Sequence, residues 1–398
     1  MHRIRYSAYF VAALIYFSCH SGSAQTDTTP NPFQIGAQVY YGFIIPHSES
    51  IRSISYSRPR GITVYAGWLL LGQKAWDYCY CYPLSGISIS LTDFDNPEIL
   101  GRAYSLMYFI EPGFGLQRKI YFNFRAALGI TYLDTPYNPL TNPSNLFYSS
   151  RISFPLQISF SALWKMSSKM SLRASGQYNH ISNGGIKEPN KGINYPTVSL
   201  GAEYTVRYRT LPEREKTRKD LYPSYLELYC MVAATGKTLT HNEKQRYPVA
   251  AAMVEMRKRF ARINSWSAGA EWVSDYSIRE ANRRNGVQQD FRRAGILAGH
   301  HLLIGRFTFY QKLGVYIYSP TRPKDPVYQR YGLVFRMTDH WLGGIDLKAH
   351  RHVADFLDVR IGYFLTKSHR NWTFYQKIDH VPRNYHKKWQ KRTCKKRA

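Results

Sequence analysis

Hydrophobic and polar residues alternate with a period of two along much of the chain. Between Ile120 and Thr131 every even position is apolar, whereas the odd positions include Asn123 and Arg125. The same alternation runs through 196–207 and 357–363. Because successive side chains of a β-strand point to opposite faces, this pattern predicts strands with one apolar and one polar face.

Comparable segments recur from one end of the chain to the other. We predict strands near 33–45, 60–71, 84–94, 101–113, 118–132, 150–165, 169–182, 194–208, 222–236, 246–261, 264–277, 293–304, 306–319, 328–338, 342–350 and 354–365. Many of them exceed the usual length of a strand in a β-sandwich. Charged residues in mid-strand, such as Arg125 and Glu203, favour a water-filled barrel interior with lipid on the apolar side. The expected fold is all-β: a transmembrane antiparallel β-barrel with an even number of strands, about 14 to 16.

The connections between the predicted strands alternate between short and long, as they do in membrane barrels. Ser167-Ser168 makes a tight turn, whereas three connections are long and polar: 134–149, 183–193 and 279–292. If the N-terminus lies in the periplasm, these long loops lie outside the cell. The strand that ends at Ser182 then reaches the depth of the outer leaflet.

The N-terminus has the features of a secretory signal peptide. Arg3 and Arg5 precede an apolar stretch at 8–17, and Gly22-Ser23-Ala24 supplies the small residues of a cleavage site. The apolar stretch is too short for a membrane-spanning helix, which needs about 20 residues. We therefore expect a signal peptide over residues 1–24 and export to the bacterial outer membrane.

Composition and charge fit this picture and define the remaining segments. Aromatic residues make up 15% of the chain, and the formal net charge is +28. A secreted β-sandwich could share the aromatic content, so composition alone leaves that alternative open. The basic body favours anionic lipid phosphates as partners, whereas an exported protein rarely meets nucleic acid. We expect one barrel over 25–365, followed by a basic tail over 366–398 that is rich in Lys and Arg.

Cysteines and histidines offer little beyond packing. The chain has five cysteines, too few for a disulfide framework at this length. Cys79 and Cys81 lie two residues apart, where an extended backbone would strain a direct bridge. Cys230 falls on an apolar strand face and is expected to act as a small hydrophobic residue. Neither His300-His301 nor Asp339-His340 has a recurring metal-ligand spacing, so we expect no metal and no cofactor.

The strand that starts at Met170 carries the candidate chemistry. His180 and Ser182 continue its apolar face, so both are expected to point toward lipid. Residues two apart on one face lie about 6 to 7 Å apart at the backbone, close enough for an imidazole to take the hydroxyl proton. A hairpin would bring Asn194 beside them to orient the imidazole. The alternative reading is that His180 and Ser182 simply mark the aqueous end of a strand.

The segment from His180 to Asn194 resembles the signature of the outer-membrane lipid A 3-O-deacylases, also called the acyloxyacyl hydrolase family. The family pattern is His-x-Ser-Asn-x-Gly followed by Pro-Asn-x-Gly-Ile. Segments 76–86 and 96–101 resemble the longer members from Bacteroidetes-type bacteria. The resemblance implies a set of roles: nucleophile Ser182, general base His180, oxyanion donors Asn183, Gly184 and Gly185, and loop-shaping Asn190.

The third member of the proposed triad departs from the family pattern. Founding members carry Glu where this chain has Asn194, which can still accept an imidazole N–H through its carbonyl oxygen but adds no charge. Glu188, at the loop tip, is the alternative orienting residue. The resemblance implies a serine esterase that hydrolyses an ester-linked acyl chain of lipid A in lipopolysaccharide. The alternative function is a non-catalytic pore or structural barrel, and the oligomeric state is left open.

Overall fold

The structure is a computed structural model that describes residues 30–216, 226–240, 243, 245–323, 325–351 and 353–365. The predicted signal peptide (1–24) and basic tail (366–398) lie outside these residues. Within the described residues, no helix has the length and apolar character needed to cross a membrane.

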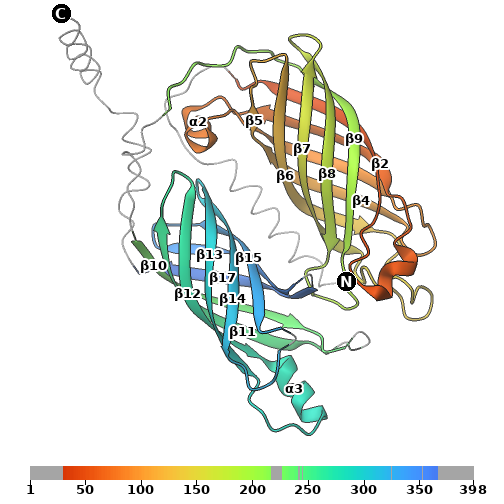
Figure 1. Cartoon of the computed structure of the whole chain (residues 1–398), viewed down its shortest axis with the longest axis vertical. Coiled ribbons are helices and arrows are strands. Elements are labelled where there is room, and N and C mark those ends of the chain that lie inside the picture. Colours follow the sequence, from red (N-terminus) through yellow and green to blue (C-terminus); the bar gives the residue numbers. More distant parts are fainter. Residues whose placement is uncertain are drawn as a thin grey trace, which may run out of the picture. The chain divides into compact units, whose positions relative to one another are not determined.

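Eight long antiparallel strands form the first barrel (Figure 1). They are β1 (Phe33–Gly42), β2 (Arg60–Leu69), β3 (Leu84–Asp93), β4 (Arg102–Glu111), β6 (Ile120–Leu133), β7 (Ile152–Lys165), β8 (Met170–Ser182) and β9 (Ile193–Thr205). Strand β1 pairs with β9, and β4 pairs with β6, so the ring of strands is closed. The two-residue strand β5 (Gly113–Phe114) pairs with the start of β6. A 3-10 helix, η1 (Glu49–Ile54), and helix α2 (Gln73–Cys79) lie in the connections.

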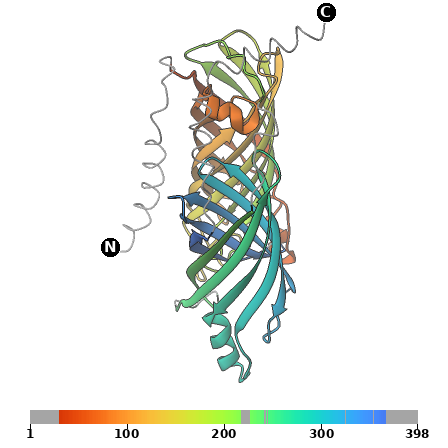
Figure 2. The same cartoon turned by 90° about the vertical axis from the view of Figure 1, so that its left-hand side faces the viewer.

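A second closed barrel of eight strands follows in the sequence, drawn from green to blue in Figure 2. Its strands are β10 (Leu226–Lys237), β11 (Tyr247–Arg259), β12 (Asn264–Asp275), β13 (Arg292–Ile304), β14 (Phe307–Tyr318), β15 (Val327–Arg336), β16 (Trp341–His350) and β17 (Val353–Phe364). Helix α3 (Tyr276–Arg284) lies between β12 and β13, at one end of this barrel. The register of β10 against β17 closes the ring.

The all-β antiparallel class is confirmed, and each predicted strand has a counterpart at similar bounds. The expectation of one barrel over 25–365 is corrected, because strand pairing divides the strands between two rings. Strand β1 pairs with β9, and β17 pairs with β10 instead of with β1. The period-two pattern determines which face of a strand is apolar. It does not determine which strand closes the ring.

A cluster of charged side chains lies in the interior of the first barrel, among uncharged polar ones. Arg173 donates to Glu111 at 2.5 Å and to Glu203 at 3.0 Å, and Arg125 also forms an ion pair with Glu111. The side chains of Arg125 and Glu111 are 1% and 0% exposed. The prediction that Arg125 and Glu203 face the interior is confirmed, but this interior is packed with side chains and is not the water-filled one we expected. A barrel of eight strands is only wide enough for side chains, so the charges neutralise one another.

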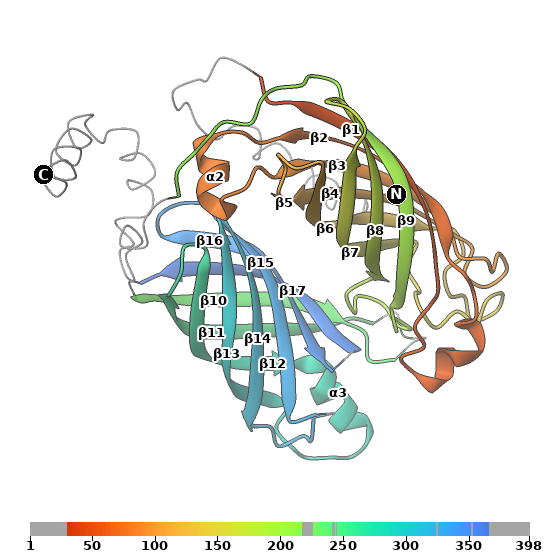
Figure 3. The same cartoon turned by 45° about the horizontal axis from the view of Figure 1, so that its top comes forward.

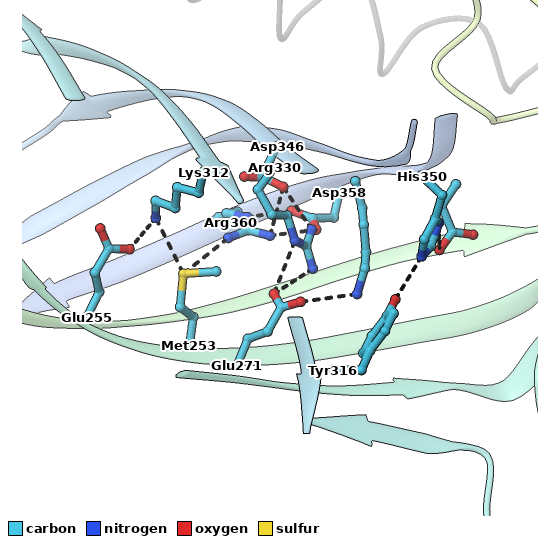
Figure 4. A network of polar contacts seen from close by, with 12 residues as sticks. Met253, Glu255, Glu271, Lys312, Tyr316, Arg330, Asp346, His350, Asp358 and Arg360 are labelled. Carbon is cyan, nitrogen blue, oxygen red and sulfur yellow. Dashed lines mark hydrogen bonds and ion pairs between the residues drawn. The ribbon is translucent and has the colours of Figure 1, made fainter. Parts of the chain in front are cut away.

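The second barrel has a similar interior. Arg330 lies 2.9 Å from a carboxylate oxygen of Glu271 and 2.8 Å from oxygens of both Asp346 and Asp358. Figure 4 shows this cluster beside a second ion pair, between Lys312 and Glu255. The side chains of both groups point into the barrel. Arg330 is fully buried. Ion pairs inside a barrel are therefore a shared property of the two domains.

The outward faces of the first barrel are apolar. Val198 and Leu200 on β9 are each 68% exposed, and Ile89 on β3 is 60% exposed. Large apolar side chains at that exposure form a surface that suits lipid acyl chains and not water. Figure 3 shows β6, β7, β8 and β9 as neighbouring strands of this wall.

A disulfide joins Cys79 to Cys81, against our expectation. Cys79 is the last residue of α2, and Tyr80 adopts a left-handed conformation with φ of 51°. This turn brings the Cα atoms of the two cysteines to 5.0 Å, within the range of natural disulfides. Our expectation of strain assumed an extended backbone, whereas the helix end turns the chain. Cys230 on β10 is a free cysteine.

We predict that Arg173→Met destabilises the first barrel by about 3 to 5 kcal/mol, because it leaves the buried Glu203 without its cationic partner. Tyr65 and Tyr121 donate hydrogen bonds to Glu203 at 3.1 and 2.7 Å but do not neutralise it. The measurement is urea unfolding in detergent, followed by the heat-modifiable gel shift of the barrel.

The matched control is Arg207→Met. Arg207 is exposed and lies just beyond the end of β9, so its loss should change stability by less than about 0.5 kcal/mol. Equal unfolding midpoints for the two variants would contradict a stabilising role of the interior ion pairs.

Candidate active site

The hairpin of β8 and β9 brings the predicted site residues together. His180 on β8 is directly opposite Asn194 on β9, and on the other side Ser182 is opposite Phe154 of β7. The ten-residue connection 183–192 joins the two strands. Because Asn194 and His180 are cross-strand neighbours, their side chains project from the same face of the sheet.

The three side chains form a continuous chain of hydrogen bonds. His180 Nε2 lies 3.0 Å from Ser182 Oγ, and His180 Nδ1 lies 2.6 Å from Asn194 Oδ1. The hydroxyl of Tyr178 donates a further hydrogen bond of 3.0 Å to Asn194 Oδ1. Both distances of His180 are within hydrogen-bond range, so the imidazole can exchange a proton with the serine while the amide holds its far side.

The site lies where the apolar outer face of the barrel meets the loops. Leu156 and Tyr178, which point outward on β7 and β8 close to His180, are 44% and 42% exposed. His180 and Asn194 are partly exposed, whereas Ser182 is only 8% exposed. Along β8 exposed residues alternate with buried ones up to His180, which lies on the outward-facing side; Ser182 is buried, and its contact with His180 places it beside that residue.

A hydrophobic cluster at this end of the barrel packs behind the site, on the inward side of β8 and β9. Ile181 and Ile193, the inward-pointing neighbours of the site residues, are 1% and 0% exposed. They belong to a buried cluster with side chains from three connections and from strand ends, including Phe94, Phe147 and Tyr195. Dense packing of this kind limits motion of the backbone that carries His180, Ser182 and Asn194.

Gly192 covers the serine and the imidazole. Its φ is +72°, and a Cβ atom added there would lie 2.8 Å from His180 Cε1 and 3.4 Å from Ser182 Cβ. The backbone N–H of Gly192 donates to the carbonyl of Phe147 at 2.9 Å. A side chain at this position would displace the imidazole, so the glycine is required by both its conformation and its contacts.

The predicted oxyanion donors are used within the loop. The amide of Asn183 donates to the Lys187 carbonyl at 2.6 Å and to Ser149 Oγ at 3.4 Å. The N–H of Gly185 donates to Asn183 Oδ1 at 3.0 Å. Sequence reasoning predicted Asn183 and Gly185 as oxyanion donors, whereas in this structure their N–H groups donate within the turn. The N–H of Gly184 has no hydrogen bond among the described residues.

Asn190 and Glu188 also contribute to the loop. Asn190 Oδ1 accepts a 3.0 Å hydrogen bond from the N–H of Asn183, and Glu188 Oε2 accepts one of 3.1 Å from the N–H of Asn190. The hydrogen bond of the His180 Nδ1 atom is to Asn194. The arrangement therefore favours Asn194 over Glu188 as the residue that orients the imidazole.

His47 is a site residue that sequence reasoning missed. It lies in the connection after β1, and its Nδ1 atom is 3.2 Å from Asn194 Nδ2. Its sequence separation from Asn194 is 147 residues, and no local pattern marks it. Only the pairing of β1 with β9 brings it to the site.

Histidines and acids elsewhere do not assemble a metal centre in the described part of the chain, where no group of three or more potential ligands meets. His301 lies 2.8 Å from Glu255 in the second barrel, and His300 contacts the side chain of Asn264 at 2.8 Å. Both are ordinary partners of side chains within strands.

The fold and the site define a barrel protein with a Ser–His–Asn hydrogen-bonded chain on its outer surface. Residues 63–203 match the family model for lipid A 3-O-deacylase (PagL), and residues 226–367 match the model for the C-terminal domain of acyloxyacyl hydrolase. The chain therefore belongs to the lipid A 3-O-deacylase and acyloxyacyl hydrolase family, which confirms the predicted resemblance. The first match runs from β2 to β9 and the second covers β10 to β17. Together with the barrel fold, the two matches indicate an outer-membrane protein.

Two solved structures are similar to the chain at low sequence identity. Neisserial surface protein A is 12% identical, covers 44% of this chain and 96% of its own, and has a TM-score of 0.29. The outer membrane enzyme PagL is 16% identical, covers 42% of this chain and 97% of its own, and has a TM-score of 0.28. No curated protein sequence matches the chain.

We predict that Gly192→Ala slows the reaction of Ser182 with a fluorophosphonate, a reagent that labels activated serines. The new Cβ would push the ring of His180 away from the serine hydroxyl, because the two would be 2.8 Å apart. The expected loss is roughly 10-fold or more, since misplacement by about 1 Å can cost about 100-fold.

Gly115→Ala is the matched control. Gly115 has a φ of +73°, but a Cβ atom there would meet its nearest neighbour at 3.4 Å. It carries the same backbone strain without a clash at the site. If both variants label at the wild-type rate, Gly192 does not determine the position of His180.

Proposed function

We propose that this protein is an outer-membrane esterase that hydrolyses an ester-linked acyl chain of lipid A, with Ser182 as nucleophile and His180 as general base. The observation that carries the proposal is the hydrogen-bonded chain from Ser182 through His180 to Asn194. It lies on the lipid-facing side of a barrel that belongs to a family of lipid A deacylases.

In the first step, Ser182 Oγ attacks the carbonyl carbon of the ester while His180 Nε2 takes the hydroxyl proton. The resulting imidazolium is held by the hydrogen bond from its Nδ1–H to Asn194 Oδ1. The tetrahedral intermediate then expels the alkoxide of the lipid, which receives the proton from Nε2. The products of this step are a deacylated lipid and an acyl ester on Ser182.

In the second step, His180 Nε2 takes a proton from a water molecule, whose oxygen attacks the acyl carbon. Collapse of this second intermediate returns the proton to Ser182 Oγ and releases the fatty acid. Each step uses one proton on one ring nitrogen, so the imidazole must keep its other proton on Nδ1 throughout.

Gly184 is the candidate donor for the oxyanion. It follows Ser182 by two residues, has a φ of +67°, and its N–H makes no hydrogen bond to another described residue. The donors of Asn183 and Gly185 are used in the loop. A backbone N–H that is held by a buried turn stabilises a developing negative charge at little reorganisation cost.

The apolar wall beside the site suits an acyl chain. Ser182 is opposite Phe154, His180 is opposite Leu156, and Val198 on β9 is 68% exposed. An acyl chain in the outer leaflet could lie along these side chains with its ester carbonyl at the level of Ser182. This placement favours a lipid ester over a water-soluble substrate.

The interior of each barrel disfavours the alternative function, a diffusion pore. In the described part of both domains, the inward-facing charges are paired with one another, and Arg125 and Arg330 are fully buried. Such an interior leaves no aqueous passage for solutes. A purely structural barrel remains the rival to test, because it would keep the fold without the chemistry.

We predict that Ser182→Ala and His180→Ala each abolish release of fatty acid from lipid A, since either change removes one of the two groups that exchange the proton. Mass spectrometry of lipid A from cells that express each variant measures the loss, and heat-modifiable gel mobility reports folding. Ser85→Ala, a serine on the outward face of β3 that bonds to Tyr108, is the control and should retain full activity. Acyl loss at the wild-type rate in Ser182→Ala would remove Ser182 as nucleophile.

We predict that Asn194→Ala lowers kcat by roughly 10²- to 10⁴-fold, because the imidazole can then rotate or take the wrong tautomer. Asn194→Asp, which is isosteric, and Asn194→Glu, which restores the family residue, should retain or raise activity, since a carboxylate accepts the same N–H and adds charge opposite the imidazolium. Glu188→Gln should be nearly silent. An inactive Glu188→Gln beside a normal Asn194→Ala would transfer the orienting role to Glu188.

A further inference from the structure

His47 reaches the site because the ladder between β1 and β9 continues past the end of β1. The N–H of Phe43 donates to the carbonyl of Pro196 at 3.2 Å, and the N–H of Ile45 donates to the carbonyl of Asn194 at 2.8 Å. These bonds hold the connection alongside β9 for three residues after Gly42. His47 lies two residues after Ile45, beside the side chain of Asn194.

The two ring nitrogens of His47 have different partners. Nε2 lies 2.9 Å from the backbone carbonyl oxygen of Lys191, and Nδ1 lies 3.2 Å from Asn194 Nδ2. Nδ1 also lies 3.3 Å from the carbonyl oxygen of Ile45, a longer contact than that of Nε2. A carbonyl oxygen can only accept, so the shorter contact places the proton of the neutral ring on Nε2. Nδ1 is then an acceptor.

This tautomer fixes the direction of every hydrogen bond that follows. An acceptor at His47 Nδ1 requires the NH₂ group of Asn194 to face it, which turns Asn194 Oδ1 toward His180. Oδ1 can only accept, so His180 Nδ1 carries a proton and His180 Nε2 presents a lone pair to Ser182. The direction of proton transfer at the serine is therefore set by the backbone carbonyl of Lys191.

The other neighbour of Asn194 cannot set this direction. The hydroxyl of Tyr178, 3.0 Å from Asn194 Oδ1, can donate or accept and would tolerate either orientation of the amide. With the amide reversed, its NH₂ would donate to His180 Nδ1. The imidazole proton would then move to Nε2 and point at Ser182, where no lone pair is left to take the hydroxyl proton.

We propose that His47 is a positioning residue that fixes the amide orientation of Asn194 and thereby the reactive tautomer of His180. The inference rests on the proposed function, and it adds a fourth member to the chain of hydrogen bonds. The amide of Asn194 must be held in one of its two orientations. A carboxylate would not need this, because its two oxygens are equivalent.

A double-mutant cycle tests this requirement. His47→Leu removes the acceptor and should lower kcat for lipid A deacylation by roughly 3- to 10-fold with little change in KM, the effect of losing one neutral hydrogen bond that selects between two orientations. In the Asn194→Asp background the same change should have almost no effect, since either carboxylate oxygen accepts from His180. His47→Asn should also stay close to the wild type, because its Oδ1 replaces Nδ1 as acceptor.

Two controls separate the outcomes. Ser48→Ala perturbs the same connection, where Ser48 Oγ contacts Ser50 Oγ at 3.0 Å, and should leave kcat unchanged. The rate of fluorophosphonate labelling of Ser182, measured on heat-modifiable protein, reports the nucleophile independently of lipid A. No labelling of the wild type would overturn the proposed function itself.

With the wild type labelled, three results would overturn the role of His47 alone. One is a normal kcat in His47→Leu, and another is an equal loss in the Asn194 and Asn194→Asp backgrounds. The third is a slow but folded His47→Asn. Recovery of the kcat of His47→Leu by Asn194→Asp is the result that a merely structural role of His47 would not produce.

Discussion

The pairing of β1 with β9 is the constraint on which the rest of the first barrel depends. In lipid no strand edge can keep free N–H and C=O groups, so a sheet must close on itself. Closure after eight strands leaves an interior with room for side chains only. The inward-facing Arg125, Arg173, Glu111 and Glu203 must then satisfy one another, because little space is left for water. The second barrel solves the same problem with its own set of charges around Arg330.

Much of this architecture could be predicted from the sequence, and the missing part has a physical cause. Alternation of apolar and polar residues is a property of each strand alone, so the strands and their faces followed from segments such as 120–131. The partner of the first strand is a property of the whole sheet. Nothing in the residues of β1 distinguishes a pairing with β9 from one with β17, and we expected one large ring for that reason.

The same distinction runs through the site. His180, Ser182 and Asn194 lie on one hairpin, so strand parity and a cross-strand register were enough to bring them together. His47 comes from the strand that closes the ring, and a single large barrel would have placed it far from Asn194. The hydrogen-bond partners of Asn183 could not be predicted for another reason: the direction of its amide depends on the turns at Gly184 and Gly185, which a sequence pattern does not determine.

The neutral Asn194 explains why the site needs a further positioning residue. A carboxylate at position 194 would stabilise the imidazolium, but burying its charge beside lipid carries a desolvation cost. An amide avoids that cost and loses two properties, the charge and the equivalence of its two ends. The second loss matters before any reaction begins, because one of its two orientations puts the proton of His180 on the wrong nitrogen. A fixed acceptor at His47, itself oriented by a backbone carbonyl, removes that ambiguity. Barrel closure thus supplies both the rigid wall behind the serine and the residue that gives its hydrogen bonds a direction.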